Sequence, residues 1–175
     1  IAHFADVMRF ELIRKYGGIW IDATCFITHP IPQYVYDYSF FSLNGAYTND
    51  LNWKWTSWFM SVKKGDLLVE NMCRFYKVYW SKHTVALTYL FLDCWILALY
   101  NHIPSLREEI DKLPDCRGKC YRISSNWNKP YSNELYTNIC SNFFVNKLTY
   151  KGVLPSTMVN GKDTIYGHML KLYSN

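Results

Sequence analysis

Three charged residues near the start of the chain, Asp6, Arg9 and Asp22, have types and a spacing that suit the binding of a small polar or anionic ligand. Asp6 and Arg9 lie three residues apart in a segment with apolar residues at helical spacing, so they share one face of a helix. Asp22 lies in the apolar run 19–27, where a carboxylate needs a partner or a function. A helical Asp-Arg pair alone is most often a surface ion pair. The interpretation as a ligand site therefore depends on the glycine pair 17–18 and on Asp22, which follow.

The elements on either side of the glycine pair must position these residues. The spacing predicts a helix over 2–16, ended by Gly17 and Gly18, because glycine is favoured just past a helix C-terminus. The β-branched and aromatic run 19–27 predicts a buried strand. The strand carries Asp22 toward its C-terminal end, where open α/β sheets bind ligands.

The rest of the chain carries further strand and helix patterns. Further strands are expected at 38–43 and 56–62, and helices at 67–82 (with Asp66 as N-cap), 84–100, 105–113, 134–140 and 164–173. The run 84–100 carries a single charge, Asp93. We interpret it as a buried helix and not as a membrane span, because it is short, charged near its middle and followed by helix-breaking residues.

Composition points to a single globular domain over residues 1–175. Half of the residues are hydrophobic, and the net charge of +5 is spread without a long basic run, which excludes a typical nucleic-acid binder. Most of the six cysteines lie singly in apolar stretches, which favours reduced thiols and a cytoplasmic setting. Cys116 and Cys120 are either free or bridged as a pair. The chain opens directly on a helix pattern with no targeting segment, so we expect a fragment of a longer protein.

The segment 5–24 resembles a known family. It reads Ala-Asp-x-x-Arg, then Tyr-Gly-Gly-Ile-Trp-Ile-Asp-Ala-Thr, and is similar to the glycosyltransferases with a DXD-containing sugar-binding region, most closely their capsular polysaccharide synthesis branch. Weaker similarities follow at 58–60, 89–93 and 146–151. The resemblance implies a GT-A fold, a Rossmann-like α/β sheet, of which this chain would lack the first N-terminal strands. Residues 1–30 would then be the donor-sugar motif region, and residues 31–175 the rest of the sheet with the acceptor-side helices.

The resemblance also implies roles for the residues of the motif. Asp6 would accept hydrogen bonds from sugar hydroxyls, and Arg9 would orient the sugar or contact the diphosphate. Gly17 and Gly18 belong to the same donor-sugar site. Asp22 would bind the donor and serve as a catalytic carboxylate and metal ligand.

The expected cofactor is Mn²⁺ or Mg²⁺, which would stabilise the negative charge of the departing nucleotide diphosphate. Thr24 stands where the DXD pattern has its second carboxylate, and a neutral hydroxyl is a weaker ligand for a hard cation. His168, near the chain end, is a further candidate because many GT-A enzymes bring a late ligand from a C-terminal loop. The alternative is a partly exposed histidine in a terminal helix.

Asp93 is a second candidate catalytic carboxylate. It would face the acceptor as a base or stabilise the transition state; the equal alternative is an N-cap or a buried hydrogen bond to Tyr or Trp. A dense group of aromatic residues between positions 47 and 58 is either a stacking platform for acceptor sugars or part of the core. They are Tyr47, Trp53, Trp55 and Trp58.

The leading hypothesis is transfer of a sugar, with retention, from a nucleotide diphosphate donor (a UDP-sugar being the first expectation) to a capsular or other surface glycan. Its partners would be the donor and a polysaccharide acceptor, with no nucleic acid, at a cytoplasmic location that includes peripheral association with the inner face of the membrane. Two alternatives stay open: a non-catalytic nucleotide-sugar or glycan binding module derived from that fold, and a membrane-associated scaffold of a polysaccharide assembly complex.

Overall fold

The computed structural model describes residues 2–44, 54–116, 118–149 and 154–174. The chain divides into two compact units, which we call unit 1 (residues 1–21 and 33–117) and unit 2 (residues 22–32 and 118–175). Helices and small sheets alternate along the chain, which confirms the mixed α/β class predicted from the sequence. We predicted from the sequence that residues 1–175 form one domain. Whether the two units together make one domain is not decided by this division, so the single domain stays a prediction.

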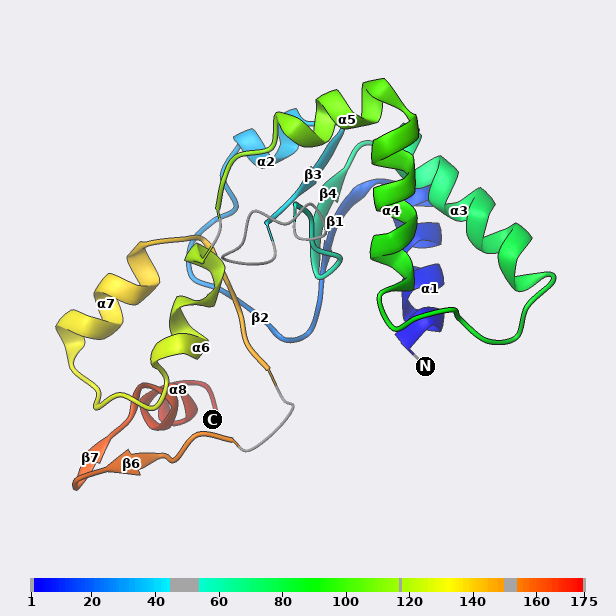
Figure 1. The fold of residues 1–175 in the computed structure, drawn as a ribbon. Coiled ribbons are helices and arrows are strands. Elements are labelled where there is room, and N and C mark those ends of the chain that lie inside the picture. Colours follow the sequence, from blue (N-terminus) through cyan, green and yellow to red (C-terminus); the bar gives the residue numbers. More distant parts are fainter. Residues whose placement is uncertain (1, 45–53, 117, 150–153, 175) are drawn as a thin grey trace. The chain divides into compact units, whose positions relative to one another are not determined.

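Unit 1 combines an antiparallel sheet with helices (Figure 1). The sheet has the strand order β1-β4-β3, formed by β1 (Gly18–Ile21), β4 (Phe59–Val62) and β3 (Phe40–Ser42). Its helices are α1 (Ala2–Tyr16), α2 (Tyr34–Asp37), α3 (Leu67–Trp80), α4 (Phe91–His102) and α5 (Pro104–Asp111). In the register, Gly18 and Phe40 both pair with Val62, so β4 is the central strand.

Helix α1 matches its predicted range, and it ends in the predicted glycine turn. The Gly17 amide donates to the Ile13 carbonyl over 2.7 Å, and both Gly17 (φ +66°) and Gly18 (φ +93°) have left-handed backbone conformations. Glycine adopts this region without the steric cost that a Cβ atom brings. The turn feeds directly into β1, so the sheet register fixes where α1 ends.

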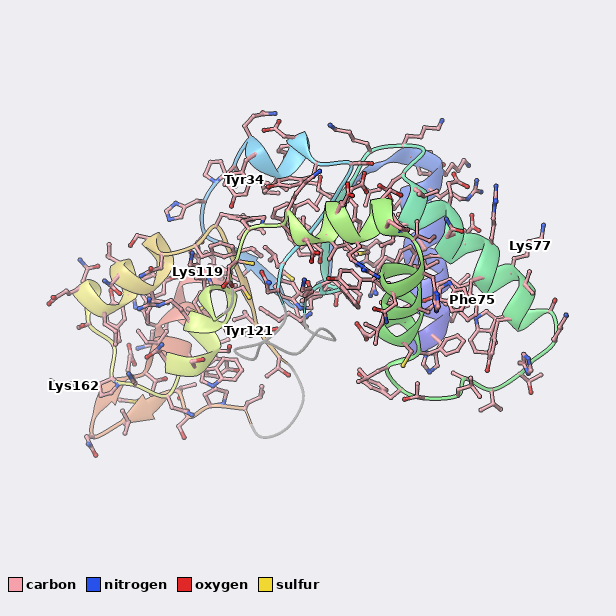
Figure 2. All side chains as sticks on the ribbon, turned by 45° about the horizontal axis from the view of Figure 1, so that its top comes forward. Tyr34, Phe75, Lys77, Lys119, Tyr121 and Lys162 are labelled. Atoms are coloured by element: carbon pink, nitrogen blue, oxygen red, sulfur yellow. The ribbon has the colours of Figure 1, made fainter. Side chains whose placement is uncertain are left out.

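The core of unit 1 lies among α1, α3, α4 and the sheet. Phe10, Met72 and Ile96, one from each of these helices, are almost completely excluded from solvent. Phe75, labelled in Figure 2, stacks on Trp95 of α4 with ring centroids 3.8 Å apart. Burial of such apolar and aromatic area is the main favourable term in packing these helices together.

Unit 2 contains two small antiparallel sheets and short helices. The strands β2 (Cys25–Ile27) and β5 (Val145–Lys147) form one sheet, and β6 (Met158–Val159) and β7 (Lys162–Asp163) form the other. Its helices are η2 (Lys119–Tyr121), α6 (Arg122–Asn126), α7 (Asn133–Ser141) and α8 (Ile165–Tyr173). Ile123, Ile139 and Ile165, from three of these helices, form its buried centre.

The prediction of one strand over 19–27 is wrong. The chain makes β1, turns at residues 22–24 with the Cys25 amide donating to the Asp22 carbonyl over 2.9 Å, and then makes β2 in a different sheet. The apolar run is continuous, but its two halves have different pairing partners, β4 and β5. Asp22 therefore directly follows β1 and does not lie inside a strand.

The helix predicted over 84–100 begins only at Phe91. Residues 84–90 are not helical, and Val85 and Leu87 are 74% and 82% exposed. Asp93 consequently lies in the first turn of α4 and not near a helix middle. Within the described ranges, no helix combines the length and the apolar character that crossing a membrane requires.

All six cysteines are free thiols in the structure. Cys116 and Cys120, the pair considered for a disulfide, are both buried. The Cys116 amide donates to the side-chain oxygen of Asn44 over 3.1 Å.

The start of α3 offers a direct test of a predicted contact. The Asp66 side chain caps the helix by accepting from the Val69 amide (3.1 Å) and also accepts from the Ser39 hydroxyl (2.6 Å), while the residue is 3% exposed. We expect Asp66→Ala to lower the free energy of unfolding by about 1–3 kcal/mol, because it removes a cap and takes the acceptor from the partly buried Ser39 hydroxyl. Asp66→Asn keeps an acceptor for the cap and should cost less. Urea denaturation followed by circular dichroism measures both, and an equal loss in the two variants would contradict the capping role.

Candidate functional site

The Asp6–Arg9 pair predicted from the sequence exists on α1. Arg9 Nη1 lies 2.7 Å from Asp6 Oδ1, and His3 Nδ1 lies 3.9 Å from Asp6 Oδ2. The Arg9 side chain is only 8% exposed and that of Asp6 17%. The pair is thus largely withdrawn from water, unlike the exposed Arg14–Glu11 pair at the same i,i+3 spacing on the same helix.

Trp20 of β1 forms part of the surroundings of this pair. The guanidinium carbon of Arg9 lies 5.1 Å from the centre of the Trp20 ring, a distance at which a cation and an aromatic face attract each other. A partly buried ion pair seldom stabilises a fold more than apolar residues of the same volume would. Stability alone therefore does not account for the choice of these two residue types.

Asp93 of α4 belongs to the same unit and accepts a hydrogen bond from Trp55 Nε1 over 3.1 Å. Burial raises the pKa of the Asp93 carboxyl, the Trp55 hydrogen bond opposes that shift, and the nearby negative charge of Asp6 adds to it. This bond agrees with the non-catalytic alternative considered for Asp93 from the sequence, a buried hydrogen bond to Tyr or Trp. Its catalytic role stays a prediction.

Tyr76 of α3 adds a polar group to these surroundings. The residue is 2% exposed, and its hydroxyl has no hydrogen-bond partner among the residues that the structure describes. Burial raises the pKa of Tyr76; the negative charge of Asp6 adds to the shift, and the positive charge of Arg9 opposes it.

We call Asp6, Arg9 and Asp93 the charged cluster of unit 1.

The glycine pair has a structural explanation. A Cβ atom on Gly17 would lie 3.2 Å from the Val62 carbonyl oxygen and 3.2 Å from the Lys64 amide nitrogen, and the φ of Gly18 is one that other residues rarely adopt. Both glycines are thus required by the passage from α1 to β1. Their predicted contribution to a donor-sugar site stays a prediction.

Asp22 and Thr24 lie in unit 2, in the turn before β2, together with Lys147 of β5. Lys147 Nζ donates to Asp22 Oδ2 over 3.0 Å and to Thr24 Oγ1 over 2.5 Å. Burial raises the pKa of the adjacent Cys25 thiol to about 11, a shift that the positive charge of Lys147 opposes. The turn is therefore partly shielded from solvent, where a charge pair is screened less than at the surface.

The third predicted metal ligand, His168, lies in α8 of the same unit. Its ring stacks on Tyr131 with centroids 3.6 Å apart and meets Tyr136 edge-on at 5.2 Å. Over the described ranges, no group of three or more His, Cys, Asp or Glu side chains gathers in a geometry for a metal ion.

The donors at the Asp22 turn fit a divalent cation poorly. Mg²⁺ and Mn²⁺ prefer several oxygen ligands, with carboxylates among them. Here one carboxylate oxygen and one neutral hydroxyl already bind an ammonium group. The cation site predicted at Asp22, Thr24 and His168 stays a prediction.

The structure thus gathers Asp6, Arg9 and Asp93 in unit 1. In unit 2, Lys147 donates hydrogen bonds to both Asp22 and Thr24. Sequence reasoning missed Trp20 and Lys147 as partners of these residues. Lys147 falls in the segment 146–151, whose weak family similarity was its one signal. Of the aromatic residues considered as a stacking platform, Trp55 and Trp58 are core residues, and Tyr47 and Trp53 lie outside the described residues.

Comparison with known proteins gives one finding. The family model described as capsular polysaccharide synthesis protein matches residues 1–169, which is nearly the whole chain. Searches of the curated proteins and of the solved structures give no significant match.

The raised pKa of Asp93 has a measurable consequence for stability. A carboxyl whose folded pKa exceeds its ordinary value of 3.8 contributes stability that is present below that value and is lost as the pH rises through the folded pKa. Asp93→Asn cannot ionise, so its stability relative to wild type should increase between about pH 3 and about pH 7. Urea denaturation at both pH values measures the difference, and a difference that does not change with pH would contradict the shift.

Proposed function

Because this chain belongs to the capsular polysaccharide synthesis protein family, we propose that it transfers a sugar from a nucleotide diphosphate donor to a polysaccharide or other surface glycan. Membership of the family by itself indicates involvement in capsular polysaccharide synthesis. The observation that carries the finer proposal is the shielded Asp6–Arg9 pair on α1, followed by the glycine turn and by Asp22 directly after β1.

The Asp6–Arg9 pair suits recognition of a sugar. A carboxylate accepts hydrogen bonds from vicinal hydroxyl groups, and a guanidinium donates several in a fixed geometry. The pair also holds itself in place, because the 2.7 Å contact and the Trp20 ring restrict the rotamers of Arg9. A binding group that is already ordered loses less conformational entropy when its ligand arrives.

The chemistry that we propose breaks the bond between the anomeric carbon of the sugar and a phosphate oxygen of the donor. The bonding electron pair leaves with the nucleoside diphosphate, and the anomeric carbon gains a bond to an acceptor hydroxyl oxygen, which loses its proton to a base. A base is most effective when its pKa approaches the working pH, and burial moves Asp93 in that direction. We therefore assign the base to Asp93. Retention of configuration, which we also propose, requires that the acceptor oxygen attack the anomeric carbon on the face from which the diphosphate leaves.

The proposal also includes a fold, a donor and a location, which the family resemblance implies. The fold would be of the GT-A type, the donor a UDP-sugar, and the location the cytoplasm with peripheral contact to the inner face of the membrane. The exposed apolar side chains of Val85 and Leu87, between α3 and α4, support such a contact. We propose that nucleic acid is not among its partners.

A second candidate is a module that binds a nucleotide-sugar or a glycan without catalysis. The neutral Thr24 hydroxyl in place of a second carboxylate favours this alternative, because it weakens the metal site on which many such transferases depend. Calorimetry with UDP-sugars separates the two candidates. Binding without sugar transfer or donor hydrolysis would support the module.

Arg9→Ala tests the donor-sugar site. In the full-length protein, screened with a panel of nucleotide-sugars, we expect turnover to fall by about 10- to 100-fold, the cost of losing charge-assisted hydrogen bonds to a ligand. The matched control is Arg14→Ala, which removes the exposed ion pair with Glu11 from the same helix at the same spacing. Equal turnover in the two variants, with equal thermal stability, would overturn the role of Arg9.

Asp22→Asn tests the carboxylate that follows β1. We expect a loss of turnover of roughly 100-fold, because a neutral amide lacks the negative charge that pairs with the Lys147 ammonium at this turn. Asp163→Asn is the matched control in unit 2, since Asp163 also pairs with a lysine, Lys171, over 2.7 Å. Turnover that survives Asp22→Asn as well as it survives Asp163→Asn would contradict the assignment.

A further inference from the structure

Lys147 is held directly over the Asp22 turn by the β2–β5 pairing. In the antiparallel register Lys147 lies opposite Cys25, and the amide of the next residue, Leu148, donates to the Thr24 carbonyl over 2.8 Å. The ammonium then reaches both Asp22 Oδ2 and Thr24 Oγ1. A residue distant in the sequence thus places a positive charge on the two side chains of the Asp-Ala-Thr motif that were expected to bind a metal.

The two side-chain bonds are not needed to tie the strands together. The backbone bonds of β2 and β5, with the Leu148–Thr24 bond beyond them, already fix the turn against β5. A partly buried ion pair such as this one seldom stabilises a fold more than apolar residues of the same volume would. The position of the Lys147 ammonium at Asp22 and Thr24 is therefore not explained by the pairing of the two strands alone.

The described contacts of Asp22 and Thr24 suit an ammonium better than a divalent cation. Two carboxylates match the two positive charges of Mg²⁺ or Mn²⁺, whereas one carboxylate and one neutral hydroxyl match the single charge of Lys147. The hydroxyl of Thr24 is a good acceptor for an ammonium N–H, although it is a weak ligand for a hard cation. The departure of Thr24 from the DXD pattern and the position of Lys147 are thus explained together.

We propose that the Lys147 ammonium, oriented by Asp22 and Thr24, binds the diphosphate of the donor in the place of a divalent metal ion. This inference rests on the proposed function for the identity of the ligand. An ammonium is a compact point charge with three donors, which suits a diphosphate oxygen.

The surroundings allow a ligand to approach the pair. The side chains of Lys147 and Asp22 are 19% and 28% exposed, so the ammonium is neither sealed inside the unit nor fully hydrated. Partial shielding strengthens its attraction for an anion relative to a surface lysine. Lys171, whose side chain is 69% exposed and pairs with Asp163, represents the ordinary surface case in the same unit.

The test is binding of inorganic pyrophosphate to the full-length protein, measured by isothermal calorimetry in excess EDTA and again with Mn²⁺. Lys147→Met removes the charge and keeps the chain length, and Lys147→Arg restores the charge. Lys171→Met is the matched control, because it also removes a lysine that pairs with an aspartate in unit 2. Near-ultraviolet circular dichroism checks that each variant is folded.

We expect wild type and Lys171→Met to bind pyrophosphate equally well in EDTA, Lys147→Met to bind at least about tenfold more weakly, and Lys147→Arg to recover part of the loss. Binding that requires Mn²⁺ and survives Lys147→Met would overturn the inference, as would an absence of pyrophosphate binding under both conditions. A sugar-transfer assay of the same samples is read separately. Pyrophosphate binding without transfer from any nucleotide-sugar would count against the proposed function and leave the role of Lys147 in diphosphate binding intact.

Discussion

The passage from α1 into β1 through two left-handed glycines is the constraint on which the arrangement of unit 1 depends. The Cβ position of Gly17 lies 3.2 Å from backbone atoms of residues 62 and 64, so the turn sits against the end of β4 and the residues after it. The β1–β4 register begins one residue later, at Gly18. The helix that carries Asp6 and Arg9 is thereby fixed to the sheet by backbone geometry. The backbone of the turn thereby positions the helix that carries these two charged side chains relative to the sheet.

Local signals in the sequence predicted the elements well wherever the pattern was decided within one segment. Helix α1 has its predicted range, and Asp66 caps α3 as its position before an apolar helical pattern indicates. The mixed α/β class was expected from the family resemblance and is confirmed, whereas no solved structure confirms the finer GT-A description. The site residues Asp6 and Arg9 were predicted as a pair because their spacing places them on one face of one helix.

Other features could not be predicted, because they depend on partners distant in the sequence. The run 19–27 is uniformly apolar, and it divides into β1 and β2 only because β4 and β5 pair with its two halves. Residues 84–90 have the composition of a buried helix, but all of them except Ala86 are exposed, since burial depends on which residues pack over them. Lys147 acquires its importance from contacts with Asp22 and Thr24, and periodicity contains no information about such pairs.

The carboxylates of the charged cluster in unit 1 have different electrostatic surroundings, which suits different roles. Asp6 lies 2.7 Å from the Arg9 guanidinium in an ion pair, and its carboxylate oxygens are suited to accepting hydrogen bonds. Asp93 instead accepts from the neutral indole of Trp55, and burial raises its pKa. Two acids in one unit whose environments differ in this way are suited to divide binding from proton transfer. The separation of roles proposed for Asp6 and Asp93 thus follows from which partner each carboxylate has, a guanidinium in one case and an indole in the other.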